Sequence, residues 1–205
     1  PMMLISVIKD AINSSDEILA ATVIDLIAAK EKDPSCRYLS EPLLFFKGFK
    51  SLQSHRVASW LWQNSRHTLA HYFQSRTSEV YGVDIHPAAK LGKGIMIDHG
   101  TGVVIGETSV VEDNVSIFQG VTLGGTGKDI GDRHPKVREG VLLSASSTIL
   151  GNVEIGRNAK IAAGSVVLND VREGTTVAGV PAREVGKSEG NVPADEIDHL
   201  IEKEN

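Results

Sequence analysis

Aliphatic residues return at every sixth position through most of the second half of the chain. Steps of six from Ile85 reach an aliphatic side chain at six of seven positions (Ile85, Leu91, Ile97, Val103, Ser109, Val115 and Val121). The steps fail in a polar stretch and resume without exception from Val137 to Val167, so ten inserted residues after Thr126 restore the register. This period fits neither an α-helix nor a half-buried strand, whose periods are about 3.6 and 2.

A period of six predicts a parallel β-helix, in which each hexapeptide forms one short strand and a turn. The aliphatic side chains point into a narrow prism whose coils stack about 4.8 Å apart. With three strands per coil, a full turn takes about eighteen residues, so residue 102 is expected to stack over Asp84. The low aromatic content of 5% and the 20 glycines suit tight turns better than an aromatic-rich sandwich.

The first part of the chain has a different pattern. Apolar residues up to about residue 81 follow helical spacing, and Gly82 ends the pattern. We therefore expect an α+β fold with an α-helical domain over residues 1–82 and a β-helix over 83–186, with an extruded loop at about 127–136. The charged tail, 187–205, is expected to be loosely ordered.

Composition excludes several classes of function. The formal net charge of −5 leaves no broad basic surface for nucleic acid. Cys36 is the one cysteine, so no intrachain disulfide can form. No apolar run approaches the length of a membrane span, and the first residues lack the basic flank of a signal peptide. A cytoplasmic location is therefore expected.

Two short segments of the repeat carry a carboxylate and an imidazole. Asp84 belongs to Asp-Ile-His-Pro, and His99 belongs to Asp-His-Gly-Thr-Gly at 98–102. A carboxylate bonded to one imidazole nitrogen raises the basicity of the other, so the two residues suit a general-base dyad. Taken alone, both could equally be ordinary residues of β-helix corners.

The polar insertion offers further candidates. Asp132, Arg133 and His134 lie on a glycine-flanked loop, which is either functional or a solvated charged turn. The segment 124–128, Gly-Gly-Thr-Gly-Lys, could cradle a phosphate with its backbone amides. It is not a P-loop, because neither Ser nor Thr follows the lysine.

The motifs together resemble one family. From about Asp33 to Gly186, the chain is similar to the bacterial serine acetyltransferases, and its motifs occur in the same order. Other hexapeptide acyltransferases share the repeat and often a terminal Gly-Val-Pro-Ala, but they lack the paired Asp-Ile-His-Pro and Asp-Arg-His-Pro. The resemblance implies a left-handed β-helix, against the right-handed rule for parallel crossovers.

The resemblance also implies a reaction. The acetyl group of acetyl-CoA passes to the hydroxyl of L-serine by direct attack in a ternary complex, without a metal. The products are O-acetyl-L-serine and CoA, and this is the first step of cysteine biosynthesis from serine. L-Cysteine is expected as a feedback inhibitor that competes with serine.

Roles carried over from the family fall on particular residues of this chain. His99 is the implied base and Asp84 its orienting carboxylate, while Asp33 and Asp98 bind the serine ammonium. Arg133 holds the serine carboxylate, with His134 beside it at the reacting centre. The residues implied to line the CoA channel are Gly125, Thr126, Ala145, Lys160 and Ala163. We interpret His86 as structural and Cys36 as inert.

The resemblance also bears on how copies of the chain assemble. The family suggests a homotrimer or a dimer of trimers, although its usual N-terminal region is longer. A complex with O-acetylserine sulfhydrylase is in doubt, because family members that dock there end in isoleucine and this chain ends in Asn205.

Three alternatives stay open at this point. The chain could be a hexapeptide acyltransferase for another small hydroxyl acceptor, such as a sugar or an antibiotic. A γ-type carbonic anhydrase would use three histidines on zinc, and His86, His99 and His134 supply that number, although the closely spaced pair of that family is missing. A silent structural β-helix would need none of these residues together.

Overall fold

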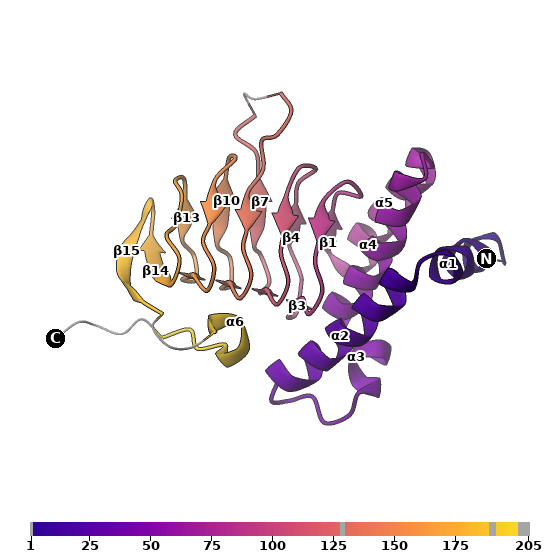
Figure 1. Ribbon diagram of the computed structural model, residues 1–205, viewed down its shortest axis with the longest axis horizontal. Helices are drawn as coiled ribbons and strands as arrows, with labels where there is room; N and C mark the ends of the chain where they lie inside the picture. Colours follow the sequence, from indigo (N-terminus) through magenta and orange to yellow (C-terminus); the bar gives the residue numbers. More distant parts are fainter. Residues whose placement is uncertain (1, 128–129, 189–191, 201–205) are drawn as a thin grey trace.

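The computed structural model describes residues 2–127, 130–188 and 192–200. Helices form one end of an elongated molecule, and the coils of a β-helix form the rest (Figure 1). The helices of the N-terminal part are α1 (Met2–Ser14), α2 (Asp16–Lys32), α3 (Ser40–Leu44), α4 (Lys47–Gln63) and α5 (His67–Tyr81). Helix α5 is followed by Gly82, whose φ of 70° lies in the left-handed region that glycine adopts readily. Within the described ranges, no helix is long and apolar enough to cross a membrane.

The coils build three sheets, which we name A, B and C. Sheet A contains β1 (Val83–Ile85), β4 (Val103–Ile105), β7 (Thr122–Gly124), β10 (Thr148–Leu150) and β13 (Val166–Val167). Sheet B contains β2 (Lys90–Leu91), β5 (Val110–Val111), β8 (Lys136–Val137) and β11 (Glu154–Ile155). Sheet C contains β3 (Met96–Ile97), β6 (Ser116–Ile117), β9 (Leu142–Leu143), β12 (Lys160–Ile161), β14 (Thr175–Gly179) and the antiparallel β15 (Ala182–Lys187).

Aliphatic side chains fill the prism in columns, one rung above another. Behind sheet A, residues of successive strands lie directly opposite one another, and none is more than 3% exposed (Ile85, Ile105, Leu123, Ile149 and Val167). This stacking is what the period of six predicts. The predicted fold class, a helical region followed by a parallel β-helix, is confirmed.

The predicted register needs one correction. Asp84 lies opposite Val104, twenty positions later, and not opposite residue 102. From Val104 to its partner Thr122 the spacing is the regular eighteen, whereas Thr122 pairs with Thr148, twenty-six positions later. The ten inserted residues are therefore split, with two in the corner between Ile97 and Val103 and eight in the loop that follows β7.

Close backbone contact joins the helices to the first coil. A Cβ on Gly48 of α4 would lie 1.9 Å from the carbonyl oxygen of Ile97, so only glycine fits there. Gly100 lies against the same helix, because its own Cβ would be 3.4 Å from the Cα of Gly48. Helix α4 therefore rests on the corner that carries Asp98 and His99.

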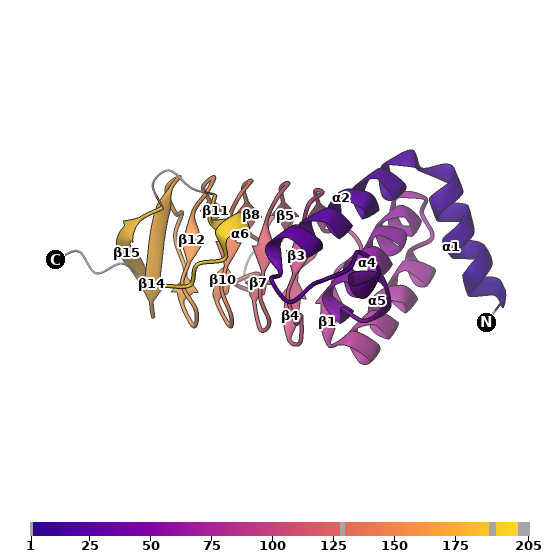
Figure 2. The same cartoon turned by 90° about the horizontal axis from the view of Figure 1, so that it is seen from below.

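The expectation of a loosely ordered tail is wrong for residues 192–200. This segment, with the short helix α6 (Pro193–Glu196), lies over the outer face of sheet C (Figure 2). Ala194 is fully buried, and its carbonyl accepts a hydrogen bond of 2.7 Å from the Ser116 hydroxyl. Farther along, His199 Nδ1 lies 3.1 Å from Ser144 Oγ, and Asp198 lies 3.5 Å from Lys160 Nζ. The hydrogen-bond and ion-pair partners of this segment are buried serine and lysine side chains of the prism. Composition alone does not indicate these contacts.

Candidate active site

Most of the predicted site residues fall at two edges of sheet A. The His99 corner, residues 98–102, connects β3 of sheet C to β4 of sheet A. The Arg133 loop, residues 125–135, connects β7 of sheet A to β8 of sheet B and projects from the prism (Figure 1). A strand of sheet A runs from one edge to the other, so the two groups do not meet within one chain.

The His99 corner presents an imidazole to solvent. The side chain of His99 is 72% exposed, and its backbone φ of 55° lies in the left-handed region that few residues other than glycine adopt. Gly100 follows at φ 75°, in the left-handed region that favours glycine, and packs tightly against Val83 and Ile97. The two extra residues of this coil therefore turn the backbone so that His99 points outward.

Two carboxylates lie beside this imidazole. Asp98 Oδ2 is 3.5 Å from His99 Nε2 and is only 21% exposed. Burial raises the pKa of Asp98, the charge of His99 opposes that shift, and the nearby carboxylate of Asp33 adds to it. Asp33 comes from the end of α2, where its Oδ1 accepts a hydrogen bond of 2.8 Å from the amide of Ser35. The structure thus places Asp33 close enough to act on Asp98, and two neighbouring carboxylates favour a cation beside them.

Asp84 has a different partner from the one expected. It lies half-buried on β1, and its Oδ1 accepts a hydrogen bond of 2.7 Å from Gln74 Nε2 of α5. Neither a hydrogen bond nor an ion pair joins Asp84 to His99 in the part of the chain that the structure describes. Gln74 was not among the predicted residues, since nothing in its local sequence indicates a contact with β1.

The Arg133 loop is tied to the corner between β4 and β5. The guanidinium of Arg133 donates a hydrogen bond of 2.7 Å to Glu107 Oε2, and this bond lowers the pKa of Glu107. A second bond from Arg133 Nη1 reaches the Gly131 carbonyl at 3.0 Å. Arg133 is therefore held in place before any ligand binds. Glu107 was also missed from the sequence, because its partner lies in the next coil.

His134 is buried at the same corner and is only 7% exposed. Its Nδ1 accepts a hydrogen bond of 3.2 Å from the Thr108 amide and lies 2.9 Å from the Thr108 hydroxyl. A Cβ on Gly106 would lie 2.1 Å from the ring, so glycine makes room for the imidazole. Burial, and then the charge of Arg133, lower the pKa of His134, which keeps the ring neutral at neutral pH.

Four of the five residues predicted to line a CoA channel divide between the same two edges. Gly125 and Thr126 open the Arg133 loop, while Ala145 and Ala163 lie at corners stacked above His99. Lys160 lies on the outer face of sheet C, 7% exposed, and its Nζ bonds to the Leu200 carbonyl. Lys128, the last residue of the candidate phosphate-cradling segment, is outside the described residues.

His86 and Cys36 lie in surroundings typical of residues with a structural role. His86 Nδ1 accepts a hydrogen bond of 3.1 Å from the Ala88 amide, and its ring contacts Trp62 edge-on. Cys36 is 2% exposed, and burial raises the pKa of its thiol. Among the described residues, no group of three His, Cys, Asp or Glu side chains could hold a metal ion.

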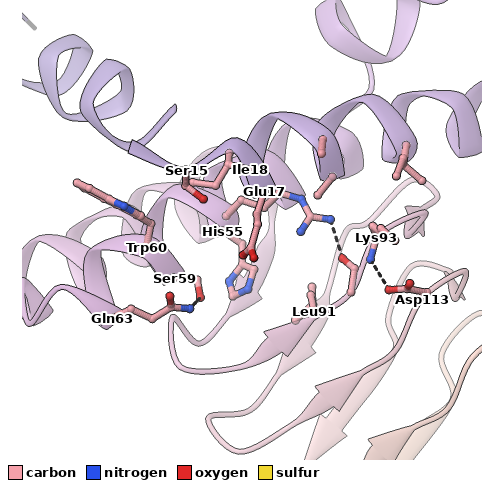
Figure 3. A pocket seen from close by; sticks show the side chains of 15 residues that line it. Ser15, Glu17, Ile18, His55, Ser59, Trp60, Gln63, Leu91, Lys93 and Asp113 are labelled. Atoms are coloured by element: carbon pink, nitrogen blue, oxygen red, sulfur yellow. Dashed lines mark hydrogen bonds between the residues drawn. The ribbon is translucent and has the colours of Figure 1, made fainter. Parts of the chain in front are cut away.

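A hollow of about 460 Å³ lies away from both edges, between α2, α4 and β2 (Figure 3). None of the predicted site residues lines it. His55 on its wall is 4% exposed, and burial lowers the pKa of this imidazole to about 3, so the ring stays neutral. The hollow is therefore not part of the candidate site.

The repeated coils define the class of the protein. A family model for the bacterial transferase hexapeptide, with six repeats, matches residues 134–169, and the chain is a hexapeptide-repeat acyltransferase. A second model, for the N-terminal part of serine acetyltransferase, matches residues 1–54. The serine acetyltransferase of Escherichia coli (strain K12) is 53% identical over 192 residues, which span 94% of this chain and 70% of that enzyme. The chain belongs to the serine acetyltransferase family.

Solved structures of the family superpose closely on this one. A serine acetyltransferase in complex with cysteine is 52% identical, with a TM-score of 0.94 over 95% of this chain and 76% of that one. The enzyme of Brucella abortus strain S19 in complex with coenzyme A is 50% identical, with a TM-score of 0.90 over 91% and 74%. The Neisseria gonorrhoeae enzyme in complex with serine is 52% identical, with a TM-score of 0.86 over 88% and 74%. The resemblance found in the sequence is confirmed.

Proposed function

We propose that this chain transfers the acetyl group of acetyl-CoA directly to L-serine, with His99 as the general base. The imidazole takes the proton of the serine hydroxyl as the oxygen attacks the thioester carbon. The carbon–sulfur bond then breaks, and the proton passes from the imidazole to the departing sulfur. The observation that carries this proposal is the exposed His99 imidazole beside the partly buried carboxylates of Asp98 and Asp33.

Recognition of serine follows from the charges. Serine is a zwitterion, and its ammonium suits the position between Asp33 and Asp98, where a cation offsets the repulsion between two carboxylates. Its carboxylate suits the planar guanidinium of Arg133, which can bind it through two parallel hydrogen bonds. The complexes of related enzymes with serine and with cysteine support a site for this class of amino acid.

Asp84 is proposed to orient His99 in the working state. The side chain of His99 is 72% exposed and is not packed in the core, whereas Asp84 is held by Gln74 on strand β1. A carboxylate that meets the second imidazole nitrogen stabilises the imidazolium formed during the reaction. Residues Gly125, Thr126, Ala145, Lys160 and Ala163 are proposed to line the channel for CoA, in line with the coenzyme A complex of the Brucella enzyme.

Thiol release tests the reaction. The purified protein, acetyl-CoA and L-serine should release free CoA thiol and give O-acetyl-L-serine detected by mass spectrometry. L-Threonine, L-homoserine and a simple sugar serve as alternative hydroxyl acceptors. A rate with serine no greater than with these acceptors would refute serine as the substrate and favour another hexapeptide acyltransferase activity.

The two halves of the site imply a shared site between protomers. The His99 corner and the Arg133 loop are separated by a strand of three residues, about 10 Å of extended chain. A single serine can bridge them only if a second copy brings its Arg133 loop to the first copy's His99 corner. We therefore propose a homotrimer at minimum, since a three-sided prism suits a closed ring. Pairing of trimers stays a prediction.

Mixing two inactive variants tests this arrangement. At serine concentrations near the native KM, His99→Ala and Arg133→Ala should each show little activity, but co-expression should restore much of it, because some mixed sites carry both native residues. Sedimentation should show a species of at least three chains. A stable, active monomer, or mixtures no more active than the separate variants, would contradict the shared site.

A further inference from the structure

One hydroxyl group holds both functional residues of the Arg133 loop. Thr108 Oγ1 accepts hydrogen bonds from the backbone amides of Arg133 at 3.0 Å and of His134 at 3.1 Å. The same oxygen lies 2.9 Å from His134 Nδ1. A hydroxyl has two acceptor sites and one donor, so the two amides fill its lone pairs and its proton is left for Nδ1 or for the carboxylate of Asp132.

The Thr108 backbone supplies a second donor to the same nitrogen. Its amide donates to His134 Nδ1 at 3.2 Å, and an amide can only donate. Nδ1 must therefore be an unprotonated acceptor, even if the hydroxyl proton turned toward the nearby carboxylate of Asp132. That carboxylate is held by Lys136, whose Nζ lies 2.5 Å away.

The proton of neutral His134 must then reside on Nε2. Gly106 lies directly against this side of the ring, and a Cβ on Gly125 would lie 3.5 Å from Nε2. Among the described residues, Nε2 has no hydrogen-bond partner of its own. An N–H group therefore faces the base of the Arg133 loop, where the CoA channel is proposed to begin.

We propose that Thr108 is a positioning residue that fixes His134 as the Nε2–H tautomer and sets the backbone of Arg133. This inference rests on the proposed function, and on the place beside Arg133 at the reacting centre that the family resemblance implies for His134. His134 then acts as a hydrogen-bond donor to the thioester oxygen, which gains negative charge as serine attacks. The two histidines then have different roles. His99 takes up and releases a proton, whereas His134 remains neutral and donates a hydrogen bond.

Three variants at this corner test the positioning role. Thr108→Val keeps the shape and the backbone amide but removes the hydroxyl, and it should lower kcat/KM about 10- to 100-fold through misplacement of the loop. Thr108→Ser keeps the hydroxyl and should remain within about threefold of the native enzyme. The matched control is Ser109→Ala, because Ser109 is 1% exposed and its hydroxyl has no partner among the described residues. If Thr108→Val is as active as this control, the positioning role is refuted.

The tautomer is measured independently of activity. In the native protein labelled with ¹⁵N-histidine, His134 should show an acceptor-type Nδ1 and a protonated Nε2 from pH 6 to 8. Loss of its signals in His134→Gln assigns them among the seven histidines. A protonated Nδ1 at pH 7 would overturn the inference whatever the variants do. Absence of thiol release with every hydroxyl acceptor would refute the proposed function, while the tautomer could still be read.

Discussion

Replacement of His99 with alanine is expected to lower turnover by at least about 100-fold, the loss typical of a missing general base. The fold should survive, because the side chain is 72% exposed and fills no part of the core. Turnover is measured by thiol release from acetyl-CoA with saturating serine, and folding by thermal unfolding of the same preparation.

A second substitution at this position distinguishes the loss of the imidazole from the effect of the positive φ on stability. The φ of 55° at this position suits asparagine better than alanine, because asparagine adopts the left-handed region more readily. His99→Asn should therefore be at least as stable as His99→Ala and equally inactive. Turnover near the native value in either folded variant would remove His99 from the mechanism.

Replacement of Arg133 with alanine is expected to weaken serine and cysteine together. L-Cysteine differs from L-serine by sulfur in place of oxygen, so both should use the same contacts for their ammonium and carboxylate. Loss of the guanidinium removes a charge-assisted pair, and the serine KM and the cysteine Ki should each rise about 10- to 100-fold. The measurement is a paired determination of both constants in one preparation.

The control for this experiment is an arginine on another face. Arg138 forms ion pairs of 2.7 Å with Glu112 and 2.5 Å with Glu154, beside sheet B and away from the proposed serine contacts. Arg138→Ala should leave both constants near their native values. If Arg133→Ala weakens serine but leaves cysteine inhibition unchanged, cysteine binds elsewhere and the shared site is wrong.

The fold could be predicted from the sequence, because each position that points into the prism needs an aliphatic side chain. The sequence was not sufficient for the register, since two neighbouring inward residues, Val103 and Ile105, are both aliphatic and both at most 1% exposed. Steps of six passed through Val103, whereas the column that begins at Ile85 continues through Ile105. Counting in steps of six therefore places the two extra residues of the His99 corner in the loop that follows β7.

The candidate site, too, could be predicted from the sequence only in part. Motifs indicated His99, Arg133 and His134, because their residue types and order are specific to a family. They could not indicate Gln74 or Thr108, whose contacts depend on which coils and helices lie side by side. Thr108 is twenty-six residues from His134 in the chain, so its role appears only once the insertion is placed.

The two ends of the prism have a further consequence for how copies of this chain can associate. Any stack of parallel strands ends in unpaired amides and carbonyls, and such edges invite another chain to add on without limit. Here α4 and α5 cover the first coil, while β15 turns back antiparallel along β14 at the last. The chain thus supplies a cap of its own at each end, as the capping units of other solenoids do. Such caps disfavour the addition of strands end to end, so a closed ring of copies would have to form through the sides of the prism.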